Sequence, residues 1–408
     1  MRKPLAVCLL QLYALALAAA AAMGGVRTDE AKYLLNIPYP HPPLARTLLE
    51  TTYGLPWNDV FWRVVFATLV IQAVWLVVRL PRHEGIGSRV LLAGAWLLSG
   101  AVVLQAASIM MAPLSALGGL VLLWAGNRAR SQYQCFLIAL FWFASVFVAY
   151  QSALFLPLAC GAFLRSGTSK RRALLYAFGP LAALALYTFT NPLALQSLVA
   201  LGGDPMTPAQ KVSQFGLLWL TAGTVVVSIA GTIGVLLSRR WDWILTLIIV
   251  CAYITLSYHA YYAIFLVPLF TAGIASLLDR HVEKGLDLSG SVLAMITSAG
   301  CVLAVVCMFV ITDRTNPARD TLRLLEPEIR SIDRTDTRLL IVGDFGHEWQ
   351  YYAPPQIREV LKYSPEMISS DADVVVCWHA CDKTLLAGKD RMPTPVESWV
   401  RRDVALHL

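Results

Sequence analysis

Long apolar stretches, separated by short polar segments, run through residues 1–312 of this 408-residue chain. Most of them hold about 18 to 22 residues, the length that an α-helix needs to cross a hydrocarbon core roughly 30 Å thick. The pattern predicts an α-helical polytopic membrane protein with about eleven transmembrane helices. We place these helices near residues 4–24, 58–79, 89–107, 109–126, 133–149, 151–165, 172–190, 216–238, 241–257, 260–278 and 290–312.

A different pattern begins near Thr312, where hydropathy falls and charged residues become frequent. Arg338–Val342 and Ala372–Cys377 are short apolar runs that are typical of buried β-strands. Between them, Pro355–Lys362 begins with proline, which is favoured in the first turn of a helix, so we expect a helix to start there. Residues 313–408 are therefore predicted to form a small α/β module beyond the transmembrane domain.

Composition and charge agree with a membrane protein and indicate its orientation. Charged residues make up 14% of the chain, against about a quarter in soluble domains. The net charge of +7 is concentrated in short loops, which indicates membrane orientation rather than nucleic-acid binding. With a cytoplasmic N-terminus, inner-loop cations outnumber outer-loop cations about three to one, which places residues 25–57 and the tail outside. The inner cations are Arg2, Lys3, Arg79, Arg82, Arg89, Arg128, Arg130, Arg165, Lys170, Arg171, Arg172, Arg239, Arg240, Arg280 and Lys284.

The N-terminal apolar stretch has two interpretations. Arg2-Lys3, the apolar residues after them and Ala20-Ala21-Ala22 are also typical of a cleavable signal peptide. However, an apolar stretch of about 19 residues is long for a signal peptide and sufficient for a membrane span. We therefore favour a retained first helix.

The outer loop at residues 25–57 carries two adjacent carboxylates, Asp29 and Glu30, directly after the first span. A carboxylate is costly in hydrocarbon, so a pair at the membrane boundary needs water, a partner or a chemical role. One such role is to take a proton from an acceptor hydroxyl. The other interpretation is that the pair solvates one helix end and caps the next helix. Spacing alone leaves both interpretations open.

Three more titratable or cationic side chains follow in or near this loop. His41 stands between prolines, whose restricted backbone holds the imidazole at a set height above the membrane. Residues 44–49 predict a short amphipathic helix that lays its leucines on the bilayer and turns Arg46 toward the polar side. Arg63 lies one turn into the next span, where it either extends to the surface or binds a lipid phosphate.

Two other candidate groups lie outside this loop. His259 is flanked by Tyr258 and Tyr261 at the outer end of a helical hairpin, either as part of an interfacial aromatic belt or as a functional group. Cys377 and Cys381 lie in the outward tail, where they form a local disulfide or remain two free thiols. A zinc site would need more ligands than this cysteine pair offers nearby.

The motifs of the first loop resemble those of GT-C glycosyltransferases that use polyprenyl-phosphate sugars. The groups with the greatest resemblance are the bacterial protein O-mannosyltransferase-like enzymes and the lipid A aminoarabinose transferases. Looser matches occur at residues 149–157, where Gln151 stands in place of a frequent lysine, and at residues 258–268. The specific matches are Asp29-Glu30, His41-Pro42-Pro43-Leu44, Tyr53-Gly54 and Arg63.

This resemblance implies the GT-C fold and a place in a bacterial inner membrane. It also implies inverting transfer of a sugar from a polyprenyl- or dolichyl-phosphate donor to a hydroxyl of a protein, lipid or glycan, because one displacement with one base inverts the anomeric centre. Asp29 would be the general base and Glu30 an acceptor-side carboxylate. Either a divalent cation or protein cations would offset the charge on the departing phosphate, so metal-dependent and metal-independent transfer both stay open. The candidate phosphate-binding residues are Arg63, His41 and His259, to which we add Arg46.

The competing hypothesis is a transporter or flippase of a lipid-linked sugar. Ion-coupled transporters usually place ionisable residues near the bilayer midplane, on broken helices. The predicted spans carry few charges at their centres, and the polar residues gather at the outer surface instead. This distribution favours surface chemistry over translocation.

Overall fold

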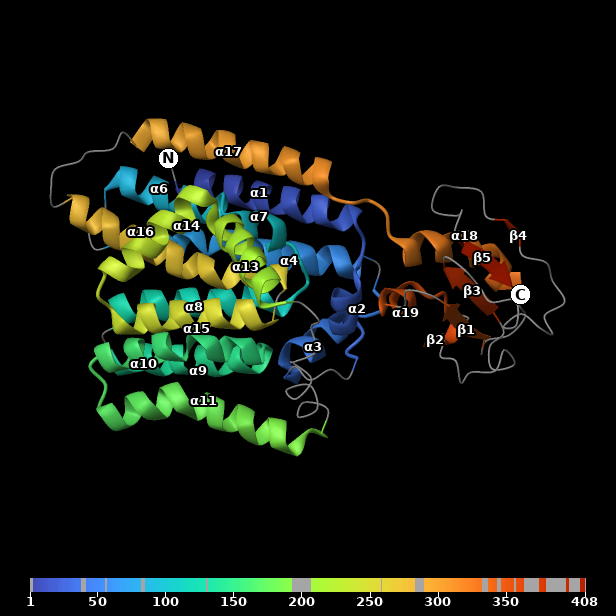
Figure 1. Ribbon diagram of the computed structural model, residues 1–408, viewed down its shortest axis with the longest axis horizontal. Helices are drawn as coiled ribbons and strands as arrows, with labels where there is room; N and C mark the ends of the chain where they lie inside the picture. Colours follow the sequence, from blue (N-terminus) through green and yellow to red (C-terminus); the bar gives the residue numbers. More distant parts are fainter. Residues whose placement is uncertain are drawn as a thin grey trace. The chain divides into compact units, whose positions relative to one another are not determined.

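The chain forms two structural units in the computed structural model (Figure 1). The helical unit comprises residues 1–21 and 36–312, and the C-terminal unit comprises residues 22–35 and 313–408. The predicted outer loop at residues 25–57 is therefore divided, since its first part belongs with the tail. The structure describes residues 3–37, 42–55, 57–81, 85–129, 131–192, 207–257, 259–282, 290–331, 337–342, 346–355, 357–362, 374–378, 394–395 and 404–407.

The described part of the helical unit consists of α-helices and two short 3-10 helices, η1 and η2. Most of the α-helices run roughly alongside one another, whereas α13 and α14 cross their neighbours (Figure 1). The bounds are α1 Lys3–Met23, α3 Pro43–Glu50, α4 Asn58–Gln72, α5 Val74–Val77, α6 Ile86–Leu97, α7 Gly100–Gln105, α8 Met111–Arg128, α9 Gln132–Val148, η1 Tyr150–Phe155, α10 Leu156–Arg165, α11 Lys170–Thr190, α13 Pro208–Gly223, α14 Val225–Leu237, α15 Trp241–Ser257, η2 Ala260–Leu266, α16 Val267–Val282 and α17 Gly290–Ile311.

The lengths of these helices bear on the predicted spans. Among the described residues, five helices or continuous helix pairs are long and apolar enough to cross a membrane, and a sixth span results if one bent pair is counted. Each predicted span coincides with a helix or a pair of consecutive helices, several of them shorter than a full crossing. The total of eleven spans remains a prediction. The five are Pro4–Met23, Asn58–Val77, Lys170–Thr190, Ala260–Arg280 and Gly290–Ile311.

One predicted span, residues 216–238, is wrong as a single straight helix. The chain bends there by 95° between α13 and α14. Thr224 stands at the bend with φ 106°, and its hydroxyl accepts a hydrogen bond from the Val227 amide at the start of α14. A side-chain cap of this kind begins a new helix, which a hydropathy average cannot detect.

Beyond the bend, α14 packs tightly against α16. A Cβ on Gly273 would lie 1.9 Å from the main-chain oxygen of Gly231, and a Cβ on Gly234 would lie 2.0 Å from the main-chain oxygen of Gly273. Such distances leave room only for hydrogen, so glycine permits the two backbones to touch. Small residues serve the same purpose where membrane helices associate, because there is no difference in polarity to draw helices together.

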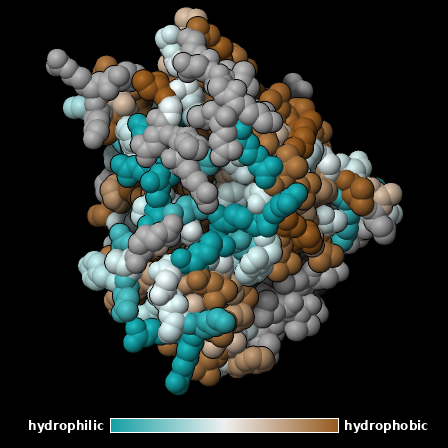
Figure 2. Space-filling view, turned by 90° about the vertical axis from the view of Figure 1, so that its left-hand side faces the viewer, coloured by the Kyte–Doolittle hydropathy of each residue, from teal (hydrophilic) through white to brown (hydrophobic). Residues whose placement is uncertain are grey.

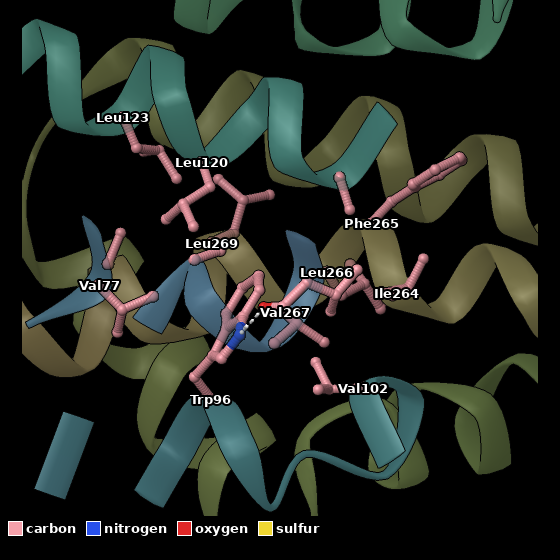
Figure 3. Packing of buried hydrophobic residues seen from close by; sticks show 14 of the residues in the cluster. Val77, Trp96, Val102, Leu120, Leu123, Ile264, Phe265, Leu266, Val267 and Leu269 are labelled. Atoms are coloured by element: carbon pink, nitrogen blue, oxygen red, sulfur yellow. Dashed lines mark hydrogen bonds between the residues drawn. The ribbon is translucent and has the colours of Figure 1, made fainter. Parts of the chain in front are cut away.

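The interior and the outer surface of the helical unit are both apolar. Inside, the Trp96 indole of α6 donates to the main-chain oxygen of Val70 at 2.9 Å, surrounded by side chains such as Leu120 and Leu266 (Figure 3). Outside, helices such as α17 expose large apolar side chains, among them Leu303 and Val310. Apolar residues on both faces are what a helix needs when lipid replaces water as its solvent.

Polar side chains gather at the end of the helical unit that the charge pattern assigns to the cytoplasm (Figure 2). There Asp242, in the first turn of α15, is fully buried and accepts hydrogen bonds from Arg165 at 2.7 and 3.1 Å. Arg240 donates to the same carboxylate, at 3.1 Å for the closer contact, and to Asn127 Oδ1 at 2.6 Å. This group joins α8, α10 and α15 by charge-assisted hydrogen bonds.

The C-terminal unit contains a five-stranded sheet with strand order β2-β1-β3-β5-β4. β1 pairs in parallel with β2 and β3, whereas β5 pairs antiparallel with β3 and β4. α18 packs its Leu322 and Leu325 side chains with Leu339 and Ile341 of β1. The bounds are α2 Thr28–Leu34, α18 Pro317–Ser331, β1 Thr337–Val342, α19 Glu348–Tyr352, β2 Ile357–Lys362, β3 Val374–Trp378, β4 Thr394–Pro395 and β5 Val404–His407.

The strands predicted at Arg338–Val342 and Ala372–Cys377 are confirmed as β1 and β3. The helix predicted to start in Pro355–Lys362 is wrong, because residues 357–362 form β2. Pairing with β1 decides the outcome, as Ile357 is buried and Glu359 pairs with Arg338 across the two strands at 3.6 Å. Neighbouring strands thus override a local preference for helix. Cys381 lies outside the described residues.

Candidate active site

The two candidate carboxylates, Asp29 and Glu30, lie in the first turn of α2, within the C-terminal unit. Asp29 remains 44% exposed, and its Oδ1 accepts a hydrogen bond from Lys32 Nζ at 2.8 Å. Residues three apart on a helix are neighbours, so this ion pair is a local consequence of the sequence. Lys32 restricts the rotamer of Asp29, while the exposed part of the carboxylate stays accessible to a substrate.

Glu30 has a different environment from Asp29. Its side chain is buried, and its Oε2 accepts a hydrogen bond from the main-chain amide of Arg27 at 3.1 Å. A glutamate that reaches back to an amide before the first turn satisfies a donor which the helix itself leaves without a partner. This contact agrees with the interpretation that part of the Asp-Glu pair caps the helix.

His347 is a titratable group near α2 that the sequence analysis did not select. It directly precedes α19, which packs against α2 in the same unit. Burial lowers the pKa of His347, and the positive charge of Lys32 lowers it further. His347 and Asp29 lie far apart in the sequence, which hides this relation, and a single histidine a few residues after an apolar run is only a weak signal.

In the helical unit, Arg63 of α4 is buried at 2% exposure, and its Nη1 donates to the main-chain oxygen of Ala107 at 3.2 Å. The guanidinium therefore stays inside the bundle and does not extend along the helix to the surface. A cation held away from bulk water interacts strongly with an anion, because the local dielectric constant is low. Guanidinium geometry also matches two phosphate oxygens at once.

A set of neutral polar groups continues from Arg63 across α7, η1 and η2. Gln105 Nε2, at the end of α7, donates to the main-chain oxygen of Ala260 at 3.2 Å, and Gln151 Nε2 of η1 donates to Tyr262 Oη at 3.2 Å. Both glutamines are buried, and among the described residues neither carboxamide oxygen has a donor. These oxygens are therefore available to hydroxyl groups of a ligand.

His259 lies exposed at the start of η2, beside this polar set. Its ring stacks on Tyr261 with centroids 5.1 Å apart and meets Tyr262 edge-on at 5.7 Å. The structure thus brings His259 and Gln105 to the same turn, since Gln105 binds the main chain of the following residue, Ala260. His41 lies outside the described residues.

The amphipathic helix predicted at residues 44–49 is confirmed as α3. The prediction that Arg46 faces the polar side is wrong. Arg46 is buried at 7% exposure, and its Nη1 donates to the main-chain oxygen of Ile37 at 2.6 Å. Its face of α3, shared with Leu49, is covered because α3 packs against α9, whereas Leu44 and Leu48 stay exposed.

A metal site in a protein is usually built from a group of His, Cys, Asp or Glu side chains. Within the described ranges, no three of these residues gather closely enough to hold an ion. Metal-dependent and metal-independent transfer remain two alternatives.

Comparison with known proteins adds evidence for the fold. No protein-family model matches the sequence, and a sequence search against curated proteins finds no match. A solved structure does match: the crystal structure of ArnT from Cupriavidus metallidurans bound to undecaprenyl phosphate, which has the GT-C fold. The match covers 100% of this chain and 99% of that chain, with a TM-score of 0.65 and 11% sequence identity. The chain is therefore a helical polytopic membrane protein with the GT-C fold.

Proposed function

We propose that this protein is an inverting glycosyltransferase that moves a sugar from a polyprenyl-phosphate carrier to an acceptor hydroxyl. The observation that carries the proposal is the full-length likeness to a GT-C structure that holds undecaprenyl phosphate. At 11% identity the likeness supports a lipid-linked donor, and it leaves the sugar and the acceptor open. The acceptor class is a hydroxyl of a protein, lipid or glycan.

Asp29 is the proposed general base. As the acceptor oxygen attacks the anomeric carbon, its proton passes to the Asp29 carboxylate, and the bond from that carbon to the phosphate oxygen breaks. The sugar is transferred to the acceptor oxygen with inversion at the anomeric carbon, and the lipid phosphate departs with the bonding electron pair. The exposure of Asp29 supports this role, while the capping contact of Glu30 favours a supporting role over direct contact with the acceptor.

The phosphate needs positive charge as it leaves, and Arg63 is the proposed source. Its burial supports this role, because a guanidinium in a low-dielectric setting stabilises a developing anion well. His259 is a proposed second donor, and His41 keeps this role as a prediction. Arg46 is a weaker candidate, because its Nη1 already serves the Ile37 carbonyl.

The proposed reaction takes place on the outer face of the membrane. Arginines at the inner end of the helical unit donate hydrogen bonds to main-chain oxygens of other segments there. Arg128 donates to Pro81, and Arg280 donates to Leu237. Retention of such cations in the cytoplasm supports a cytoplasmic N-terminus and an extracytoplasmic C-terminal unit.

The test is a transfer assay with purified protein and a panel of labelled polyprenyl-phosphate sugars. Asp29→Asn is compared with wild type, and Asp279→Asn, at the far end of α16 from η2, is the matched control. We expect wild type and the control to release polyprenyl phosphate, and Asp29→Asn to lose this activity by about a hundredfold or more. Equal turnover in all three would remove Asp29 from the mechanism. Donor binding without turnover in wild type would favour a transporter.

A further inference from the structure

The segment that leads into α2 is held through its main chain by the C-terminal unit. Asn316, at 1% exposure, donates its side-chain amide to the main-chain oxygens of Val26 at 2.8 Å and Gly24 at 3.3 Å. Arg319 adds a third contact, from Nη1 to the main-chain oxygen of Met23 at 3.2 Å. The main-chain oxygens of three residues in this segment are therefore held by two side chains of the tail.

Tyr352 contacts the same segment as a hydrogen-bond acceptor, whereas Asn316 and Arg319 are donors. Its hydroxyl accepts a hydrogen bond from the Val26 amide at 2.6 Å. Between these contacts, Gly25 adopts φ +68°, and a Cβ there would lie 2.7 Å from Tyr352 Oη and 3.0 Å from Asn316 Nδ2. Only glycine suits both the left-handed backbone and the lack of space.

The beginning of α2 is attached in a similar way. The Thr28 hydroxyl donates to the Glu348 carboxylate of α19, and Arg27 Nη2 donates to the main-chain oxygen of Asp313 at 3.2 Å. Asp29 is the next residue after Thr28, so the chain is fixed immediately before the proposed base. Residues of α18, of α19 and of the segment before α18 thus hold a segment that the sequence places at the end of the first span.

We propose that Asn316 and Tyr352 are positioning residues for Asp29, and that the C-terminal unit serves to set the geometry of the general base. This inference rests on the proposed function, in which Asp29 takes the acceptor proton. Displacement of a catalytic group by about 1 Å lowers a rate by roughly a hundredfold, so a main-chain support that close to the base affects turnover directly.

Asn316 offers a clean separation of this role from a stabilising one. Its Oδ1 accepts a hydrogen bond from the Arg319 amide at 3.0 Å and thereby caps α18, while its Nδ2 holds the α2 segment. Serine and aspartate are both good helix caps that lack the amide donor. Asn316→Ser and Asn316→Asp therefore keep the cap and remove the contacts to Gly24 and Val26.

The experiment measures kcat and donor KM of the full-length protein, together with hydrogen exchange of residues 23–30 and of α18. In Asn316→Ser and Asn316→Asp we expect kcat to fall about ten- to a hundredfold with donor KM unchanged, faster exchange at residues 23–30, and unchanged exchange in α18. Agreement between the neutral and the charged variant excludes an effect of the new charge. Tyr352→Phe, which removes the acceptor of the Val26 amide, should shift kcat in the same direction.

Glu359→Gln, on the exposed side of β2, is the control for a general disturbance of the tail and should match wild type. Wild-type kcat in both Asn316 variants, despite faster exchange at residues 23–30, would overturn the positioning role and leave the proposed function standing. Unchanged exchange would show that Asn316 does not hold the segment. Inactivity of wild type with every donor would instead refute the proposed function, and the exchange data would still decide whether Asn316 holds the segment.

Discussion

Asp242 provides the sharpest test of what holds the helical unit together at its inner end. Its carboxylate is fully buried and receives hydrogen bonds from two arginines, Arg165 at 2.7 and 3.1 Å and Arg240 at 3.1 and 3.4 Å. Asp242→Asn keeps the shape of the side chain and removes its negative charge. The new NH2 group is itself a donor and faces the guanidinium donors of Arg165 and Arg240. The variant therefore leaves two guanidinium groups without their anion.

The magnitude follows from the exposure of the two partners. Removal of one member of a buried ion pair costs about 3–5 kcal/mol, because the remaining charge is stranded. Here the side chains of Arg165 and Arg240 are 34% and 22% exposed, so water partly solvates the charges left without an anion. We expect Asp242→Asn to lower the free energy of unfolding by about 2–4 kcal/mol.

The assay is denaturant-induced unfolding of the purified protein in detergent micelles. Asp59→Asn is the matched control, because Asp59 also lies in the first turn of a helix, α4, and is only half-buried. Asp59→Asn should lower the free energy of unfolding by about 0.3–1 kcal/mol, the typical contribution of a carboxylate near a helix N-terminus. The double variant with Arg165→Met should show coupling of about 1 kcal/mol or more, since it removes one stranded cation. The reasoning would be refuted if Asp242→Asn lowered the free energy of unfolding no more than Asp59→Asn does. Strictly additive effects of Asp242→Asn and Arg165→Met on that free energy would also refute it.

Three further predictions follow from the described contacts. Arg63→Lys keeps the charge but loses the paired donors, so donor KM should rise about tenfold in the transfer assay. Gly273→Val places side-chain atoms where the Gly231 main-chain oxygen lies, so the protein should lose its cooperative thermal transition in detergent. The folded-state pKa of His347 is below its ordinary value of 6.5. The unfolded chain therefore binds more protons below about pH 6.5, and melting temperature should fall there.

Each of these predictions has its own control. Arg89→Lys, near the inner end, should leave donor KM unchanged, and an equal rise in both lysine variants would contradict a special role for Arg63. Gly216→Val, at a position with open space, should unfold like wild type. His347→Gln should show a smaller fall in melting temperature between pH 7 and pH 5. The same pH dependence in His347→Gln and wild type would mean that His347 does not contribute.

Transfer of apolar side chains into lipid depends mainly on local composition, so the positions of the membrane helices follow from the sequence alone. The apolar runs of β1 and β3 and the amphipathic pattern of α3 were predictable as well, because each is a local pattern of residues. The adjacent carboxylates after the first span also stand out without a structure. Each of these features depends on one continuous stretch of chain, at most about 20 residues long.

Tertiary structure decided the features that depend on distant partners. Residues 357–362 became β2 because β1 pairs with them, and Arg46 became buried because α3 meets α9. The support of the α2 segment is the extreme case, since Asn316 and Val26 are 290 residues apart. No local pattern marks an asparagine that binds two main-chain carbonyls so far away, because main-chain hydrogen bonds carry no signature in the residues that receive them.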